Sequence, residues 1–129
     1  MRREGRIVMQ DAGQSHQDAF LKFATESWRF IHVFEKAMQD IDEKKRNRYE
    51  SRLNWYRKQM DVAMEIFGCQ FIDFAGKPYD TGMAVTPLNL NDVAEDVPLV
   101  VDYMIEPTIL DTDGHVMQMG TAMLRRAEQ

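Results

Sequence analysis

Apolar and polar residues follow two different periods along this chain, and the period changes at Gly68. Residues 14–67 contain no glycine or proline, and their apolar positions recur at steps of three and four, as in an amphipathic helix. Gly68 then stands where a helix C-cap is expected. Beyond it, short apolar runs separated by Gly, Pro and Asp predict strands. The pattern predicts an α+β protein, with a helical half followed by a small all-β domain.

The helical half has two apolar runs that are out of phase with each other. Residues 42–48 lie between them and contain no apolar residue. One interpretation is a single helix about 80 Å long, at 1.5 Å per residue. The other is a turn near residues 42–48 that gives a helical hairpin, and the phase break and the charge cluster favour it. Ser15, with Asp18 three residues on, is a plausible N-cap for the first helix.

Two helices with such wide apolar stripes cannot cover each other fully, so two copies of the chain are predicted to form a four-helix bundle. Trp55 is expected in the bundle core or the dimer interface. The residues expected at the interface are Phe20, Trp28, Ile31, Phe34, Met38, Leu53, Tyr56 and Met60. We therefore divide the chain into a flexible N-terminus over residues 1–14, a helical dimerisation region over 15–68, a β domain over 69–126 and a tail over 127–129.

The β half is predicted to contain about four to six strands. Its strongest strand pattern covers residues 99–105, and residues 69–73 form a strand or the exit from the helix. Turn signals stand at Gly76, Pro78 and Gly82. Residues 108–124 suggest a hairpin whose turn lies at residues 111–114.

Composition changes this picture through charge. Residues 1–68 carry 13 Lys and Arg against 11 Asp and Glu, whereas residues 69–124 carry one basic residue, Lys77, against nine acidic ones. The acidic β half would repel nucleic acid and suits a basic protein surface. The single Cys69 excludes an intrachain disulfide, and there is no apolar run for a signal or membrane segment, so a cytoplasmic location is expected.

No catalytic triad, phosphate loop or metal-ligand spacing is present, so we expect neither an enzyme nor a cofactor. Asp111-x-Asp113-Gly114 resembles the start of a calcium loop, but Ala122 stands where a bidentate Glu is required. We interpret the segment as a turn. The three histidines and Cys69 are scattered without the spacing of a zinc site.

Four segments in order resemble the GrpE family, the nucleotide exchange factors of DnaK-type chaperones. They are residues 30–38, the helix end at residues 60–68, the Pro78-Tyr79-Asp80 turn and the hairpin centred on Gly114. The resemblance covers roughly residues 20–126. It implies a homodimeric cochaperone, held by a four-helix bundle, that acts in protein folding and the stress response. In that family one β domain wedges into the chaperone's ATPase domain, opens its cleft and releases ADP.

The resemblance also implies which residues contact the chaperone. They are Lys36, Gln39, Tyr79, Asp80, Thr81, Gly82, Met83, His115 and Leu124. Tyr103 is expected at the same surface because aromatic anchors rimmed by charge are typical of interfaces. His115 stands where the family has an arginine, and a histidine lacks the bidentate fork of arginine. Glu106-Pro107 replaces a Gly-Tyr pair. Only about 14 to 19 residues precede the bundle, so the family's long helical stalk is expected to be missing or vestigial. The alternative is a dimeric scaffold or adaptor that keeps the fold without exchange activity.

Overall fold

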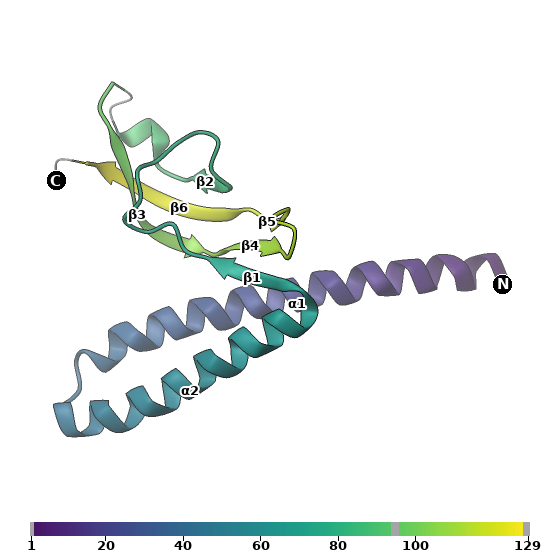
Figure 1. Ribbon diagram of the computed structural model, residues 1–129, viewed down its shortest axis with the longest axis horizontal. Helices are drawn as coiled ribbons and strands as arrows, with labels where there is room; N and C mark the ends of the chain where they lie inside the picture. Colours follow the sequence, from purple (N-terminus) through teal and green to yellow (C-terminus); the bar gives the residue numbers. More distant parts are fainter. Residues whose placement is uncertain (1, 94–95, 128–129) are drawn as a thin grey trace.

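The computed structural model describes the backbone of residues 2–93 and 96–127 and the side chains of residues 13–93 and 96–127. Two helices come first, and small β-sheets follow them (Figure 1). The α+β prediction is therefore confirmed. The elements are α1 (Arg2–Met38), α2 (Glu43–Phe67), β1 (Cys69–Ile72), β2 (Val85–Pro87), the 3-10 turn η1 (Leu90–Asp92), β3 (Leu99–Glu106), β4 (Thr108–Asp111), β5 (Val116–Gln118) and β6 (Gly120–Arg126).

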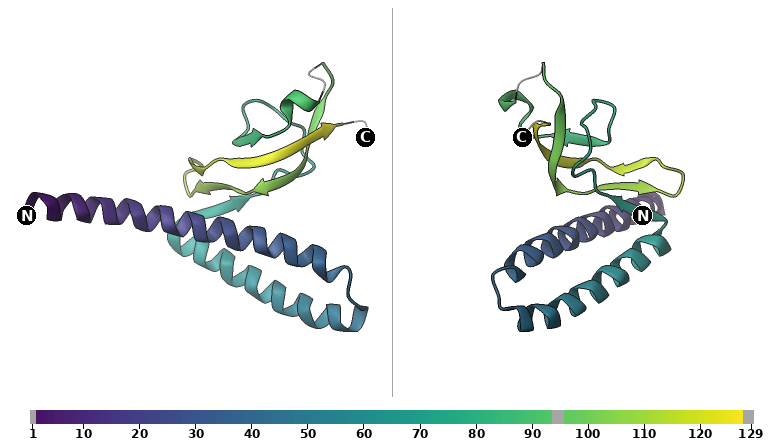
Figure 2. Two further views of the ribbon diagram at one scale, coloured as in Figure 1. Left: turned by 180° about the vertical axis from the view of Figure 1, so that it is seen from behind. Right: turned by 60° about the vertical axis from the view of Figure 1, so that its left-hand side comes forward.

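Helix α1 begins earlier than the sequence pattern predicted. The expected N-cap at Ser15 is wrong, because α1 is helical from Arg2. Gly13 lies within α1 and does not end it, because one interior glycine costs a helix only about 1 kcal/mol. The early part of α1 runs on beyond the end of α2 (Figures 1 and 2). Within the described residues, neither helix carries an apolar stretch that could cross a bilayer.

The connection between the helices lies at residues 39–42, before the charge cluster in which a turn was expected. Asp42 caps α2, and its carboxylate accepts a hydrogen bond from the backbone N–H of Lys45 at 3.0 Å. Arg46 then reaches back to the end of α1 and donates to the carbonyl oxygens of Met38 at 3.1 Å and Ile41 at 3.0 Å. The basic cluster thus begins α2, and one of its members satisfies carbonyls that a helix C-terminus leaves unpaired.

Helix α2 runs back beside α1, and the β half lies on one side of the pair (Figures 1 and 2). Ile31, Met38 and Leu53 form the buried contact between the helices. Gly68 ends α2 in the left-handed region at φ 95° and turns the chain directly into β1.

The β half consists of two three-stranded sheets. One has the order β1-β4-β5 and is antiparallel; the other has the order β2-β6-β3, with β2 parallel and β3 antiparallel to β6. Buried Pro107 turns the chain from β3 to β4, and the Gly114 turn joins β4 to β5. The second arm of the predicted 108–124 hairpin is divided, because the chain leaves the first sheet at Met119 and enters the second at Gly120.

One face of α1 packs against both sheets. Leu21 and Ala24 join a cluster with Met64, Cys69 and Ile109 beneath the first sheet. Trp28, one turn further along α1, lies in the core of the second sheet, and its partners there are Val85, Val101, Met104, Ala122 and Leu124. The helices and the β half therefore share continuous apolar packing.

Candidate functional site

The turn at residues 79–83 is built by hydrogen bonds from its own residues and from β3. The carboxylate of Asp80 accepts from the backbone N–H of Gly82 at 3.1 Å, and the N–H of Met83 donates to the carbonyl oxygen of Asp80 at 2.9 Å. The N–H of Tyr79 donates to the carbonyl oxygen of Leu99 at 2.8 Å, which ties the turn to β3. Asp80, Thr81 and Gly82 are exposed. This turn is a fixed, solvent-facing feature of the β half.

A groove of about 490 Å³ lies beside this turn. Its walls are mostly apolar, with Asp80 and Thr81 at the rim; the lining residues are Tyr79, Asp80, Thr81, Leu90, Val97, Pro98 and Leu99. Tyr79 and Met83 are half-buried because they also pack on the core of the second sheet. An aromatic side chain beside an acidic rim is typical of a protein-interaction surface.

Lys36 and Tyr103 meet although they come from different halves of the chain. The Lys36 ammonium lies 5.8 Å from the centre of the Tyr103 ring, within the range of a cation–π interaction. Tyr103 remains about half exposed. Next to it, Asp102 pairs with Arg125 at 3.3 Å. The structure thus joins two of the expected partner-contact residues into one surface at the junction of α1 and β3.

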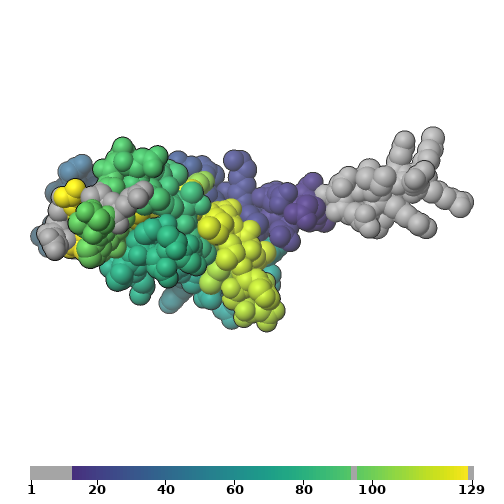
Figure 3. Space-filling model, turned by 90° about the horizontal axis from the view of Figure 1, so that it is seen from above, coloured from purple at the N-terminus to yellow at the C-terminus, as the bar shows by residue number. Residues whose placement is uncertain are grey.

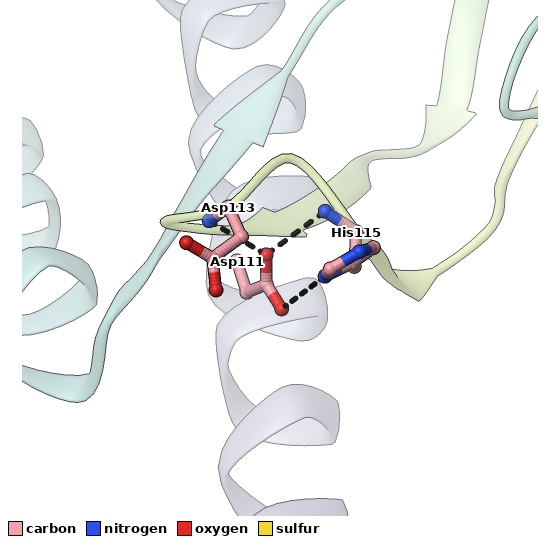
Figure 4. A group of neighbouring side chains, drawn as sticks. All are labelled: Asp111, Asp113 and His115. Carbon is pink, nitrogen blue, oxygen red and sulfur yellow. Dashed lines mark hydrogen bonds and ion pairs between the residues drawn. The ribbon is translucent and has the colours of Figure 1, made fainter.

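His115 lies in the β4–β5 turn, away from that junction (Figures 1 and 4). The carboxylate of Asp111 accepts hydrogen bonds from the backbone N–H groups of Asp113 at 2.9 Å and His115 at 2.8 Å, and its second oxygen lies 3.5 Å from His115 Nδ1. The backbone hydrogen bond from His115 is the main reason why the pKa of Asp111 is below its usual value. One carboxylate oxygen from Asp111, one from Asp113 and one ring nitrogen of His115 all lie within 4.8 Å of one another. Asp111 is engaged in shaping the turn, as the sequence interpretation expected.

Of two other residues expected to contact a partner, Leu124 is buried and Gln39 is exposed. Leu124 is almost fully buried in the core of the second sheet, so its side chain cannot reach a partner. The alternation along β6 places it on the inner face of the sheet, opposite Val101 of β3. Gln39 is exposed directly after α1.

Several residues expected at a dimer interface are buried by their own chain. Trp28 lies in the β core, and Ile31, Met38 and Leu53 pack between α1 and α2. A partner helix cannot reach these four side chains. The other four keep some accessible surface: Phe20, Phe34 and Met60 are half-buried and Tyr56 is exposed, and the Phe20 ring stacks on Phe67 with centroids 4.1 Å apart.

A second set of large apolar residues remains exposed on the helices. The set consists of Phe23, Phe30, Val33, Tyr49, Trp55, Tyr56, Val62, Ile66 and Phe67. Phe30 stands two positions after Trp28, so it points about 200° around α1 from the face that the β half covers. The β half lies over the helix pair in the view from above (Figure 3). In the sequence these residues form a second apolar stripe on each helix. Periodicity alone could not distinguish this exposed stripe from the stripe that is buried.

No protein-family model, curated protein or solved structure that was compared with this chain matches it.

Proposed function

We propose that this protein is a GrpE-like cochaperone that binds the ATPase domain of a DnaK-type chaperone and promotes ADP release. The observation that supports the proposal is the order of elements and motifs in one chain. Two helices, a glycine cap at Gly68, the Pro78-Tyr79-Asp80 segment that leads into the 79–83 turn and the glycine turn at Gly114 follow one another in the order of the family resemblance. Each motif is loose by itself, and the series carries the argument.

The contacting surface is the junction of α1 and β3 together with the 79–83 turn. Lys36 and Tyr103 supply a cation and an aromatic ring, while Asp80 and Asp102 keep the acidic character of the β half. Aromatic anchors surrounded by charge suit a basic protein surface. The Gly114 turn, with His115, would form a separate contact.

Exchange by this route needs no catalytic residue. A wedge acts by binding the open, nucleotide-free conformation of its partner more tightly than the closed, ADP-bound one. A difference of about 4 kcal/mol between the two affinities changes nucleotide affinity about a thousandfold.

We also propose that the two helices form a hairpin that dimerises as a four-helix bundle. The exposed apolar set on α1 and α2 supports it, because packing against a second copy would remove these large side chains from water. The far faces of the helices, marked by Phe30 on α1 and Ile66 on α2, would pack against their copies. This arrangement leaves both β halves outside the bundle. Trp28, Ile31, Met38 and Leu53 are already buried within their own chain. The proposed interface therefore does not include these four residues, and it differs from the interface that the sequence pattern indicated.

Affinity measurements with and without nucleotide test the proposed function. The protein is titrated into the ATPase domain of the cognate DnaK-type chaperone by calorimetry, first nucleotide-free and then saturated with ADP. An exchange factor binds the nucleotide-free form far more tightly. If its binding lowers the chaperone's affinity for ADP, then bound ADP must lower the chaperone's affinity for the exchange factor by the same ratio. Equal affinity for the two forms would contradict the exchange activity.

The second candidate function is a dimeric scaffold or adaptor that binds a chaperone without exchanging its nucleotide. His115 favours it, because the ring is short and is held beside Asp111 where the family has an arginine. Binding with equal affinity to both nucleotide states supports this candidate. Absence of binding to any DnaK-type chaperone points to a different partner.

A further inference from the structure

A hydrogen bond between side chains joins α1 to the β half. The amide of Gln118 donates a hydrogen bond to the hydroxyl oxygen of Thr25 at 2.6 Å, across 93 positions of sequence. Thr25 is buried and Gln118 is half-buried. The same amide nitrogen lies 3.4 Å from the carbonyl oxygen of buried Pro107. Gln118 therefore touches α1 and the corner between β3 and β4 while it belongs to β5.

The position of this hydrogen bond allows it to fix how the β half is oriented on α1. Thr25 stands between Ala24, which packs under the first sheet, and Trp28, which packs in the second. The hydrophobic effect itself is favourable but non-directional. A hydrogen bond requires a short distance and a near-linear angle. The Thr25–Gln118 bond thus fixes one orientation among those that the apolar packing allows.

The orientation of the β half sets where its exposed features lie relative to the helices. Tyr79, at one end of the 79–83 turn, is attached to Leu99 at the start of β3, whereas the Gln118 amide contacts Pro107 directly after the end of that strand. A rotation of the β half at the joint therefore shifts the Tyr79 end of the turn relative to the helices. A wedge that must open a partner depends on this angle, and a difference of about 1 Å in positioning can cost a large factor in activity.

We propose that Thr25 and Gln118 are positioning residues that hold the β half at a fixed angle to the helices. The consequence for nucleotide exchange rests on the proposed function, whereas the fixed angle itself does not. The two statements can be measured separately.

The matched variants are Thr25→Val, which removes the hydroxyl at constant shape, and Thr25→Ser, which keeps it. A third variant, Thr25→Val with Gln118→Met, removes both polar partners and leaves no unpaired amide at the joint. It keeps the question answerable if Thr25→Val alone does not fold.

Spin labels on cysteines introduced at the exposed positions Lys58 and Thr86 report the distance between α2 and β2. Cys69 is buried, and burial raises its pKa, so the reagent attacks the introduced thiols. An excess of unlabelled protein separates distances within one chain from distances between copies.

We expect a single narrow distance distribution for the unmodified chain and for Thr25→Ser, and a broadened or shifted distribution for Thr25→Val and for the double variant. A Thr25→Val or double-variant distribution that superimposes on that of the unmodified chain would overturn the proposal.

ADP release from the chaperone gives the second readout. At saturating protein, Thr25→Val should lower the maximal release rate and Thr25→Ser should preserve it. If the unmodified chain does not accelerate release at all, the proposed function fails, and the distance distributions still decide whether Thr25 and Gln118 fix the angle. If Thr25→Val broadens the distance distribution but leaves the release rate unchanged, Thr25 and Gln118 fix the angle of the β half, and this angle does not affect exchange.

Discussion

Gly120 stands where the chain passes from one sheet to the other, and replacing it with alanine tests how the two sheets are joined. A Cβ at this position would lie 2.5 Å from Thr108 Oγ1, 2.6 Å from Met104 Cε and 2.9 Å from the carbonyl oxygen of Glu106. Thr108 cannot easily move away, because its hydroxyl donates to the carbonyl oxygen of Ala84 at 2.6 Å and accepts from the N–H of Gly120 at 3.1 Å. Only the end of the Met104 side chain is flexible.

The expected cost follows from these contacts. Overpacking a well-filled core by one methyl group costs typically 1–3 kcal/mol, and we expect about 3 kcal/mol here because a backbone carbonyl must shift. For a chain of this size that corresponds to a fall in Tm of about 10 °C. The assay is urea unfolding monitored by the fluorescence of Trp28 in a Trp55→Phe background, since Trp28 lies in the β core and Trp55 is exposed. The m-value should not change.

Gly13→Ala is the matched control. Among the described residues, a Cβ at Gly13 would meet no atom within 4 Å other than those of its own stretch of helix, and alanine favours the helix by about 1 kcal/mol. The control should leave stability unchanged or raise it slightly. A Gly120→Ala free energy of unfolding within about 0.5 kcal/mol of that of the unmodified chain, the range of an ordinary surface substitution, would refute the packing argument at the crossing.

Three further predictions concern the helices and the β4–β5 turn. Ile66→Asp should convert the proposed dimer to a monomer in sedimentation experiments, because it places a charge in the exposed apolar face. Asn54→Asp, at another exposed position of α2, should leave the dimer intact. An unmodified chain that sediments as a monomer at micromolar concentration would contradict the dimer. Arg46→Met should lower the free energy of unfolding by about 1–2 kcal/mol because the carbonyls at the end of α1 lose their donor; an unchanged urea midpoint would contradict that role. The folded-state pKa of Asp111 is lowered, so its stabilising contribution is complete above the unfolded value of about 4 and is lost as pH falls through the folded pKa. Tm measured from pH 5 to pH 2 should therefore fall more steeply for the unmodified chain than for Asp111→Asn, and parallel curves would contradict the assignment.

The sequence allowed the order of elements to be predicted because local signals marked it. The left-handed cap at Gly68, the strand from Leu99 and the Gly114 turn each depend on a few neighbouring residues. The position of the connection between the helices was missed, since the polar run at residues 42–48 resembles a turn although Asp42 already starts α2.

The partners of each apolar face could not be predicted in the same way. Periodicity places Trp28 on an apolar face of α1, but it does not indicate whether a second helix or a sheet covers that face. The structure places Trp28 in the β core and leaves Phe30 exposed. The contact between Thr25 and Gln118 spans 93 positions, and no local pattern signals it. Long-range packing therefore decides which of the expected contact residues are accessible.

ADP release from the chaperone tests the central claim most directly. The ATPase domain of the cognate DnaK-type chaperone is loaded with a fluorescent ADP analogue and mixed, in a stopped-flow instrument, with excess unlabelled nucleotide and increasing amounts of this protein. The account predicts a release rate that rises with protein concentration to a plateau, and an Asp80→Lys variant that needs a higher concentration to reach half of that plateau. A release rate that stays at its intrinsic value at saturating protein would contradict the account.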